Sequence, residues 1–413
     1  MTNIIVYRAK VTHLSTYGLV LFLFLAPFEY PLADLMSVSP LRLVGILVIG
    51  LAIIDILLQK CRKIDYRFWG VLFWLFYGLV TFLWVSNVDR FQSYYSVYLN
   101  NAIMFLVLSI VNFTKKEAET LKRAMIWGVG VLLLYMTFVP EAVIYSQTHH
   151  RLTLNAGTEG LDQNYLAALM LMAFGMVFYK LCNEEQKKVH KVISAVFCAG
   201  IVCYVILTGS RSGVLAVVFI MLICINSSWK KRLCIGIPVL LVLIIGVSLL
   251  RQNLPEEFLE RFSISALTGH EAESGTRLII WQHALKSLKN FKWVFGYGVG
   301  ASQTIIDNLM GRDYAIHNHY IAMLVEVGVL GFSCILYPML RMTHIMWKKD
   351  KGVFTGFLGI LIMTFFLDVV TTKFFWSAMI LLSACCSAAR NPRNSSIWEG
   401  QKEHDKKNEI SNC

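Results

Sequence analysis

The amino-acid sequence predicts an all-α, polytopic membrane protein of about 12 transmembrane helices with one large outer loop. Three observations lead to this prediction: an apolar composition, recurrent apolar stretches of membrane-spanning length, and basic residues placed in alternate connections. Of the 413 residues, 56% are hydrophobic and only 15% are charged, whereas soluble domains carry roughly 25% charge. A chain of this composition is expected to lie in a lipid bilayer.

The apolar stretches have lengths near the roughly 17 to 25 residues that cross a bilayer as a helix. The first has basic flanks, but no small-residue cleavage site follows it, so we expect a retained helix and not a removed signal peptide. The predicted spans are 14–34, 41–59, 68–86, 94–113, 124–144, 164–182, 191–208, 213–227, 233–250, 318–340, 352–369 and 374–389.

Lysine and arginine placement predicts that both termini lie in the cytoplasm. Alternate connections carry basic clusters such as Lys60, Arg62, Lys63 and Arg67, and the connections between them carry few. The formal net charge of +12 is therefore mainly a topology signal. It is divided among short loops, so we expect no nucleic-acid partner, which would need one continuous basic patch.

The chain divides into a membrane domain, residues 1–393, and a polar tail, 394–413, that we expect to be disordered and cytoplasmic. Within the membrane domain, the connection 251–317 is far longer than a turn and is expected to face outward. In this loop, 278–292 places Trp281, Leu285 and Leu288 on one helical face and lysines on another. This pattern predicts an amphipathic helix in the headgroup plane.

Two arginines on the predicted outer side are candidates for binding an anion. Arg211 lies among small residues in the short connection 208–213, and Arg277 lies at the first turn of the predicted amphipathic helix, where free amides favour an anion. A guanidinium group pairs bidentately with phosphate. The alternatives are an arginine that snorkels to the interface at 211 and a solvated loop arginine at 277.

His317 and Asn318 stand where the outer loop meets the apolar segment 318–340. Titratable groups at this depth are costly and usually functional, and a histidine can accept a proton from a hydroxyl. Alternatively, His317 is an interfacial histidine bonded to its neighbours. A metal site formed with His319 is disfavoured, because residues two apart on a helix point to different sides.

Asp162 and Asn164 lie at the outer start of the span 164–182. Their carboxylate and carboxamide groups suit sugar hydroxyls, although Asp162 equally suits the N-cap of the helix that follows. Two arginines and a histidine on one side of the membrane fit a substrate with a diphosphate and a nucleophilic hydroxyl. A lipid-linked glycan has both groups.

The chain resembles the O-antigen ligase and O-antigen polymerase superfamily of bacterial membrane proteins. The resemblance rests on His317-Asn318 followed by Gly328 and Gly331, and it covers about residues 150–335. It is supported by the turn 208–213, by Arg277, by 162–167 and by the alternating glycines of 296–300, which allow a tight turn and close backbone approach.

This resemblance implies a GT-C-like fold and an enzyme of the bacterial cytoplasmic (inner) membrane. The enzyme would transfer an oligosaccharide from an undecaprenyl diphosphate carrier to an acceptor sugar hydroxyl at the outer face, with no metal or other cofactor. By analogy, Arg211 and Arg277 would hold the diphosphate and His317 would orient or deprotonate the acceptor. The remaining predicted substrate-binding residues are Asn318, Asp162 and Asn164. A flippase and a chain-length regulator are further implied partners.

Within the superfamily, we favour a polymerase of surface or capsular polysaccharide or O-antigen, because a polymerase requires no outer membrane in the host. A ligase that transfers the glycan to lipid A core is the alternative. A transporter or flippase is the alternative of another class, but transporters usually place their binding groups at the bilayer midplane within internal repeats. A channel is disfavoured because the helix before Gly296-Tyr297-Gly298 is basic and not an apolar pore helix.

Overall fold

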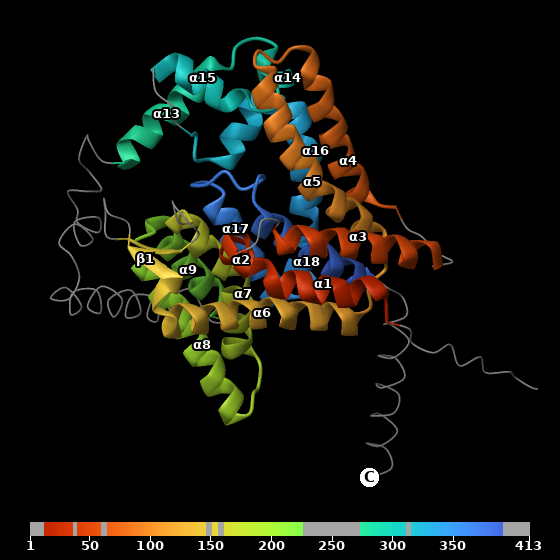
Figure 1. Cartoon of the computed structure of the whole chain (residues 1–413), viewed down its shortest axis with the longest axis vertical. Helices are drawn as coiled ribbons and strands as arrows, with labels where there is room; N and C mark the ends of the chain where they lie inside the picture. Colours follow the sequence, from red (N-terminus) through yellow and green to blue (C-terminus); the bar gives the residue numbers. More distant parts are fainter. Residues whose placement is uncertain are drawn as a thin grey trace, which may run out of the picture.

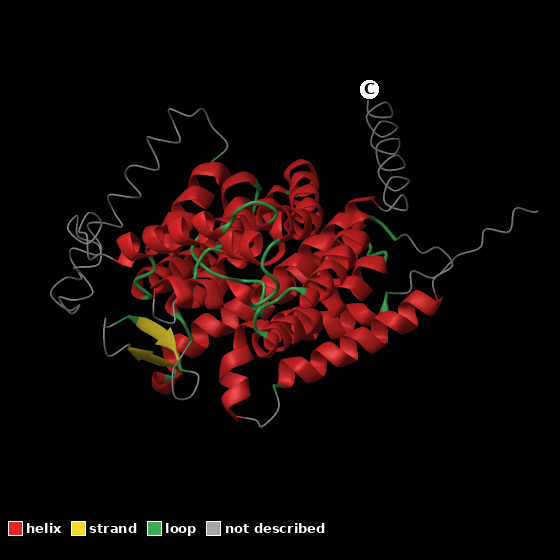
Figure 2. Ribbon diagram, turned by 90° about the horizontal axis from the view of Figure 1, so that it is seen from above, coloured by secondary structure: helices red, strands yellow, loops and turns green. Residues whose placement is uncertain are grey.

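The computed structural model describes residues 12–35, 39–58, 64–145, 151–155, 161–225, 273–310 and 315–390, which are almost entirely helical (Figures 1 and 2). The predicted span 233–250, the segment 251–272 of the large loop and the tail 394–413 lie outside the described residues.

The first half of the chain contains α1 Leu14–Leu25, η1 Ala26–Phe28, α2 Glu29–Leu35, α3 Pro40–Leu58, α4 Tyr66–Val80, η2 Thr81–Leu83, α5 Val88–Ile110, α6 Lys115–Phe138, η3 Pro140–Ala142, β1 Val143–Tyr145 and β2 Leu152–Leu154. The second half contains α7 Gln163–Asn183, α8 Lys188–Leu207, α9 Arg211–Cys224, α13 Glu273–Ser287, α14 Lys292–Phe295, α15 Ala301–Met310, α16 His319–Lys349, α17 Lys351–Met363 and α18 Lys373–Arg390.

Every predicted span within the described residues coincides with a helix. Eight of these helical segments are long and apolar enough to cross a membrane, and α9 and α17 are apolar but shorter. The chain is therefore a multi-pass membrane protein. A total of about 12 spans and a GT-C-like architecture stay predictions.

Three details of the sequence prediction are wrong. The chain is not wholly α-helical, because β1 and β2 pair antiparallel with Val143 opposite Leu154 (Figure 2). The predicted span 124–144 ends earlier, at Phe138, since Pro140 begins a short 3-10 turn that leads into β1. The predicted span 352–369 ends at Met363, and residues 364–372 form a non-helical connection instead.

Polar contacts collect at two opposite ends of the helix bundle. At one end, the backbone N–H of His13 donates to Glu117 Oε1 at 2.7 Å, and Lys122 pairs with Asp350 at 2.7 Å. These contacts join the starts of α1, α6 and α17. Helices α1, α6 and α17 therefore all begin at this end of the bundle.

At the other end, Lys373 pairs with Glu29 at 2.6 Å, and Arg90 pairs with Asp307 at 2.8 Å. These contacts join the starts of α5 and α18 to α2 and α15. Consecutive long helices therefore run in alternating directions between the two ends. The basic clusters predict that the first end faces the cytoplasm.

Helices α13, α14 and α15 lie together at the second end, which the basic clusters predict to be the outer end and which is called so below (Figure 1). They form a second small core in which Ile280 and Ala284 of α13, and Leu288 just after it, pack with Ile306 and Ile316. The predicted helix is present, and of its predicted apolar face Leu288 is buried and Trp281 packs on this core, while Leu285 is exposed. Its placement in the headgroup plane stays a prediction. α13 packs against α15 and the start of α16, so protein contacts select its buried face.

The alternating glycines of 296–300 dock on a break in α16. Gly328 has φ 60° and ψ −172°, a region essentially restricted to glycine. The N–H groups of Tyr297 and Gly298 donate to the carbonyls of Val325 and Glu326, both at 2.8 Å. A β-carbon on Gly328 would lie 2.2 Å from the carbonyl oxygen of Val294. The predicted close backbone approach is therefore confirmed.

We predict that Gly328→Ala destabilises the protein strongly. A side chain in this backbone region costs about 1–3 kcal/mol, and the clash with Val294 adds to that cost. The measurement is the thermal unfolding midpoint of the purified protein in detergent. The control is Gly50→Ala in α3, where an added β-carbon meets nothing within 4 Å and is expected to stabilise by about 0.5–1 kcal/mol. Equal midpoints for the two variants would contradict the proposed docking.

Candidate functional site

Three helices begin at the outer end with side-chain N-caps. Asp162 Oδ1 accepts from the N–H of Asn164 at 2.8 Å, and Ser210 Oγ accepts from the N–H of Gly213 at 3.1 Å. Asn318 Oδ1 accepts from the N–H of Ile321 at 3.1 Å. These bonds fix the first turns of α7, α9 and α16, and each first turn carries a partial positive charge.

The starts of α7 and α9 are joined through Asn164. Its side-chain oxygen accepts from Ser210 Oγ at 2.8 Å and from Nη2 of Arg151 at 3.3 Å. Arg151 also donates from Nε to the carbonyl of Thr208 at 2.9 Å. Asn164 and Arg151 are both buried. Their contacts hold the turn that delivers Arg211 at the first position of α9.

The starts of α7 and α16 are joined through the connection 364–372. The hydroxyl of Tyr165 donates to the carbonyl of Asp368 at 2.6 Å. The carboxylate of Asp368 lies 3.2 Å from Nδ1 of His319, whose own N–H donates to the carbonyls of Thr364 and Leu367. Asp368 thus connects Tyr165 of α7 to His319, which follows His317 by two positions.

His317 and Arg277 are linked through Trp281. The indole Nε1 of Trp281 donates to the carbonyl of Ile316 at 2.8 Å, next to His317 in the chain. Arg277 precedes Trp281 by four residues on α13, so both lie on the same helical face. His317 has φ 49°, an uncommon left-handed conformation for a residue with a side chain. Both His317 and Arg277 are half-buried.

The structure therefore attaches the three predicted charged residues, Arg211, Arg277 and His317, to one cluster of element ends. The N-cap interpretation of Asp162 is confirmed, and Asn318 is also a cap. Asn164 belongs to the buried network beneath Arg211. Roles for these six residues in binding or catalysis stay predictions.

Sequence reasoning missed Arg151, Asp368 and Glu326. Arg151 falls in a connection with no motif, and Asp368 was counted within a span. Glu326 is 0% exposed in α16; its carboxylate accepts from Ser302 Oγ at 2.6 Å and from the hydroxyl of Tyr98 at 2.9 Å. An acidic residue inside an apolar segment is itself a signal of function or of a required partner.

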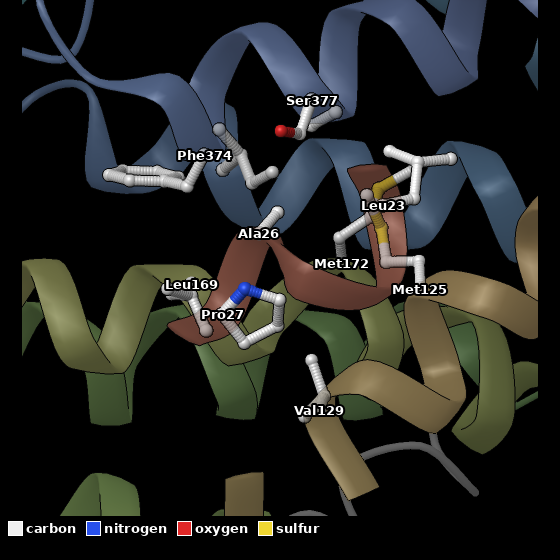
Figure 3. Close-up of a pocket in the computed structure, with 11 residues that line it drawn as sticks. Leu23, Ala26, Pro27, Met125, Val129, Leu169, Met172, Phe374 and Ser377 are labelled. Carbon is white, nitrogen blue, oxygen red and sulfur yellow. The ribbon is translucent and has the colours of Figure 1, made fainter. Parts of the chain in front are cut away.

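A separate cavity of about 20 Å³ lies between η1, α6, α7 and α18 (Figure 3). Pro27, Met125, Leu169 and Phe374 line it, and the hydroxyl of Ser377 at its edge already donates to the carbonyl of Lys373. None of the predicted site residues lines this cavity. It is a packing gap in the apolar core and not the polar site.

Helices of membrane-spanning length define a multi-pass membrane protein. The capped helix starts at one end carry the partial positive charge that suits an anion. The family described as O-antigen ligase matches residues 193–336, which include Arg211, Arg277, His317 and Asn318. The teichuronic acid biosynthesis protein TuaE of Bacillus subtilis (strain 168) is 22% identical over 362 residues, 78% of this chain and 71% of that protein. The resemblance predicted from the sequence is therefore confirmed.

These similarities support a membrane enzyme of the glycosyltransferase or ligase type in polysaccharide biosynthesis. The match with the O-antigen ligase family runs from α8 to the middle of α16, so it contains the break at Gly328. Asp162, Asn164 and Asp368 lie outside this match and are connected to it only through the folded structure.

We predict that Ser210→Ala lowers both stability and activity. The substitution removes the N-cap of α9, which costs about 1 kcal/mol, and breaks the bond to Asn164 that fixes the turn before Arg211. The measurements are the thermal unfolding midpoint and the yield of long-chain glycan in cells. Ser96→Ala is the control, because Ser96 is exposed and donates only to its own helix. If Ser210→Ala matched this control in both assays, the turn would not depend on the bond.

Proposed function

We propose that the protein transfers oligosaccharide repeat units from an undecaprenyl diphosphate carrier to an acceptor sugar hydroxyl. The reaction would take place at the outer face of the bacterial cytoplasmic membrane. The observation that supports this proposal is the attachment of Arg211, Arg277 and His317 to one cluster of helix starts. Positive groups in that cluster suit a diphosphate, and the long apolar helices around it suit a polyprenyl chain.

In the proposed reaction, the acceptor oxygen attacks the anomeric carbon of the donor glycan. A new carbon–oxygen bond forms as the bond from that carbon to the diphosphate oxygen breaks, and undecaprenyl diphosphate leaves. Arg211 and Arg277 offset the negative charge that grows on the leaving diphosphate, an electrostatic role that often dominates catalysis. The arginines therefore act on the donor.

His317 acts on the acceptor in this scheme. Its imidazole takes the proton of the attacking hydroxyl, or orients that hydroxyl, as the bond to the anomeric carbon forms. Asp368 contacts His319, the first residue of α16, so Asp368 is a positioning residue for the start of this helix next to His317. Asp162 is exposed at the start of α7, where it would contact sugar hydroxyls, and the buried Asn164 and Asn318 act as positioning residues at the starts of α7 and α16.

We favour a polymerase of surface polysaccharide, in which the acceptor is another lipid-linked repeat unit. The similarity to a teichuronic acid biosynthesis protein of Bacillus subtilis supports this choice, because that protein acts in the synthesis of a polysaccharide. A ligase that uses a lipid A core acceptor is the second candidate, favoured by the description of the matching family. A flippase and a chain-length regulator are the proposed partners.

We predict that Arg211→Ala, Arg277→Ala and His317→Ala each abolish long-chain glycan. The expected loss for each is about a hundredfold or more, the effect typical of removing one group that stabilises a transition state. The measurement is the amount and length of glycan in cells that express each variant, with the membrane level of the protein checked by immunoblot.

The control for these variants is Arg42→Ala, which removes an exposed arginine at the start of α3, at the same end of the bundle. It should leave glycan length and amount unchanged. Full-length polymer from all three site variants at normal protein level would refute the catalytic assignment.

We also predict that Arg277→Lys is inactive. Lysine keeps the positive charge but cannot make the two parallel hydrogen bonds that a guanidinium makes with phosphate. Glycan length in cells is again the measurement, and Arg277→Ala provides the baseline. Normal activity of the lysine variant would show that charge alone is sufficient at this position.

A further inference from the structure

A lateral groove runs between α4 and α16 on the membrane-facing surface. Its volume is about 320 Å³; α4 contributes Tyr66, Trp69 and Phe73, and α16 contributes Cys334 and Tyr337. Trp69, Phe73 and Tyr337 are each about half exposed, at 46%, 52% and 51%. Aromatic rings that face lipid around a hollow form a surface suited to an acyl chain.

The groove follows from close contact between the two backbones beside it. A β-carbon on Gly70 would lie 2.7 Å from the carbonyl oxygen of Cys334 and 2.7 Å from Cγ of Pro338. Pro338 has no N–H to donate back to Cys334 within α16. The helices therefore touch at Gly70, and the larger side chains on either side stand apart and leave the hollow.

Two guanidinium groups stand at one mouth of the groove. The carbon Cζ of Arg341 lies 4.7 Å from the ring centre of Tyr66, and Arg341 also bonds the hydroxyl of Tyr337. Arg390 lies 4.8 Å from the same Tyr66 ring and pairs with Asp65 at 3.1 Å. Within the described part of the chain, Arg341 pairs with no carboxylate, so its charge stays available to an anion.

This mouth lies at the end of the bundle opposite the candidate functional site. Asp65 is the N-cap of α4 and Arg390 is the last residue of α18, and both belong to the end that carries the basic clusters. Negatively charged headgroups concentrate at the cytoplasmic leaflet and attract basic residues near it. The carrier diphosphate would bind at the other end, so the carrier is not the occupant.

We propose that the groove is a binding site for an anionic phospholipid of the cytoplasmic leaflet. The lipid phosphate contacts Arg341, which Tyr66 and Tyr337 hold in place, and one acyl chain lies along Trp69 and Phe73. The bound lipid would reinforce the contact between α4 and α16 below the break at Gly328. The exclusion of the carrier as occupant rests on the proposed function, whereas the groove and its arginines do not.

The test is native mass spectrometry of the full-length protein in detergent, titrated with phosphatidylglycerol or phosphatidylcholine. The wild type is expected to retain phosphatidylglycerol in preference to phosphatidylcholine. Arg341→Ala is expected to lower retention of phosphatidylglycerol about fivefold, the usual effect of one basic residue near anionic lipid. Lys348→Ala is the matched control, because it removes an exposed positive charge of α16 outside the groove.

A second variant tests the hollow itself. Ser333 lines the groove, and Ser333→Trp is expected to fill it and to displace the lipid while Arg341 stays in place. The proposal would be overturned by equal retention of the two lipids in the wild type. Unchanged phosphatidylglycerol retention in both groove variants, or a dimer of the wild type that Arg341→Ala dissociates, would overturn it as well.

Discussion

The break in α16 at Gly328 leaves a non-helical backbone at the edge of the membrane, where every polar backbone group needs a partner. The segment 296–300 meets this need, because the N–H groups of Tyr297 and Gly298 donate to two carbonyls just before the break. The same segment is continuous with α14 and α15. This backbone contact thus holds α14 and α15 against α16 and fixes the position of the start of α16 relative to them.

The position of the candidate site depends on that contact. His317 precedes α16 directly, and Trp281 of α13 bonds the carbonyl of Ile316. If α16 were continuous and straight, α13 would not be held against its start, and Arg277 would lie elsewhere. The position of Arg211 depends on Asn164, because the side-chain oxygen of Asn164 accepts a hydrogen bond from Ser210, the residue before Arg211. These two polar connections join residues 35 and 46 positions apart in the chain.

Composition and motif spacing predicted much of the fold and supplied the candidate site residues. Apolar length alone located the spans, since a helix must be about 20 residues long to cross the bilayer. The sequence also predicted Arg211, Arg277 and His317 as site residues, because charged groups at the membrane border are rare. It could not predict Asp368, since the residue lies within an otherwise apolar stretch and its partners Tyr165 and His319 are distant in sequence. The burial of Ile280 and Ala284 in α13 was also not predicted, because tertiary contact with α15 selects the buried side of that helix.

The most direct test of the proposed function is an experimental structure of the full-length protein in lipid nanodiscs with a bound undecaprenyl-diphosphate glycan. We expect density for the diphosphate between the start of α9 and α13, in contact with Arg211 and Arg277. The first sugar should lie beside His317. A diphosphate bound at another surface, or a structure in which these three side chains open onto different faces, would contradict the account.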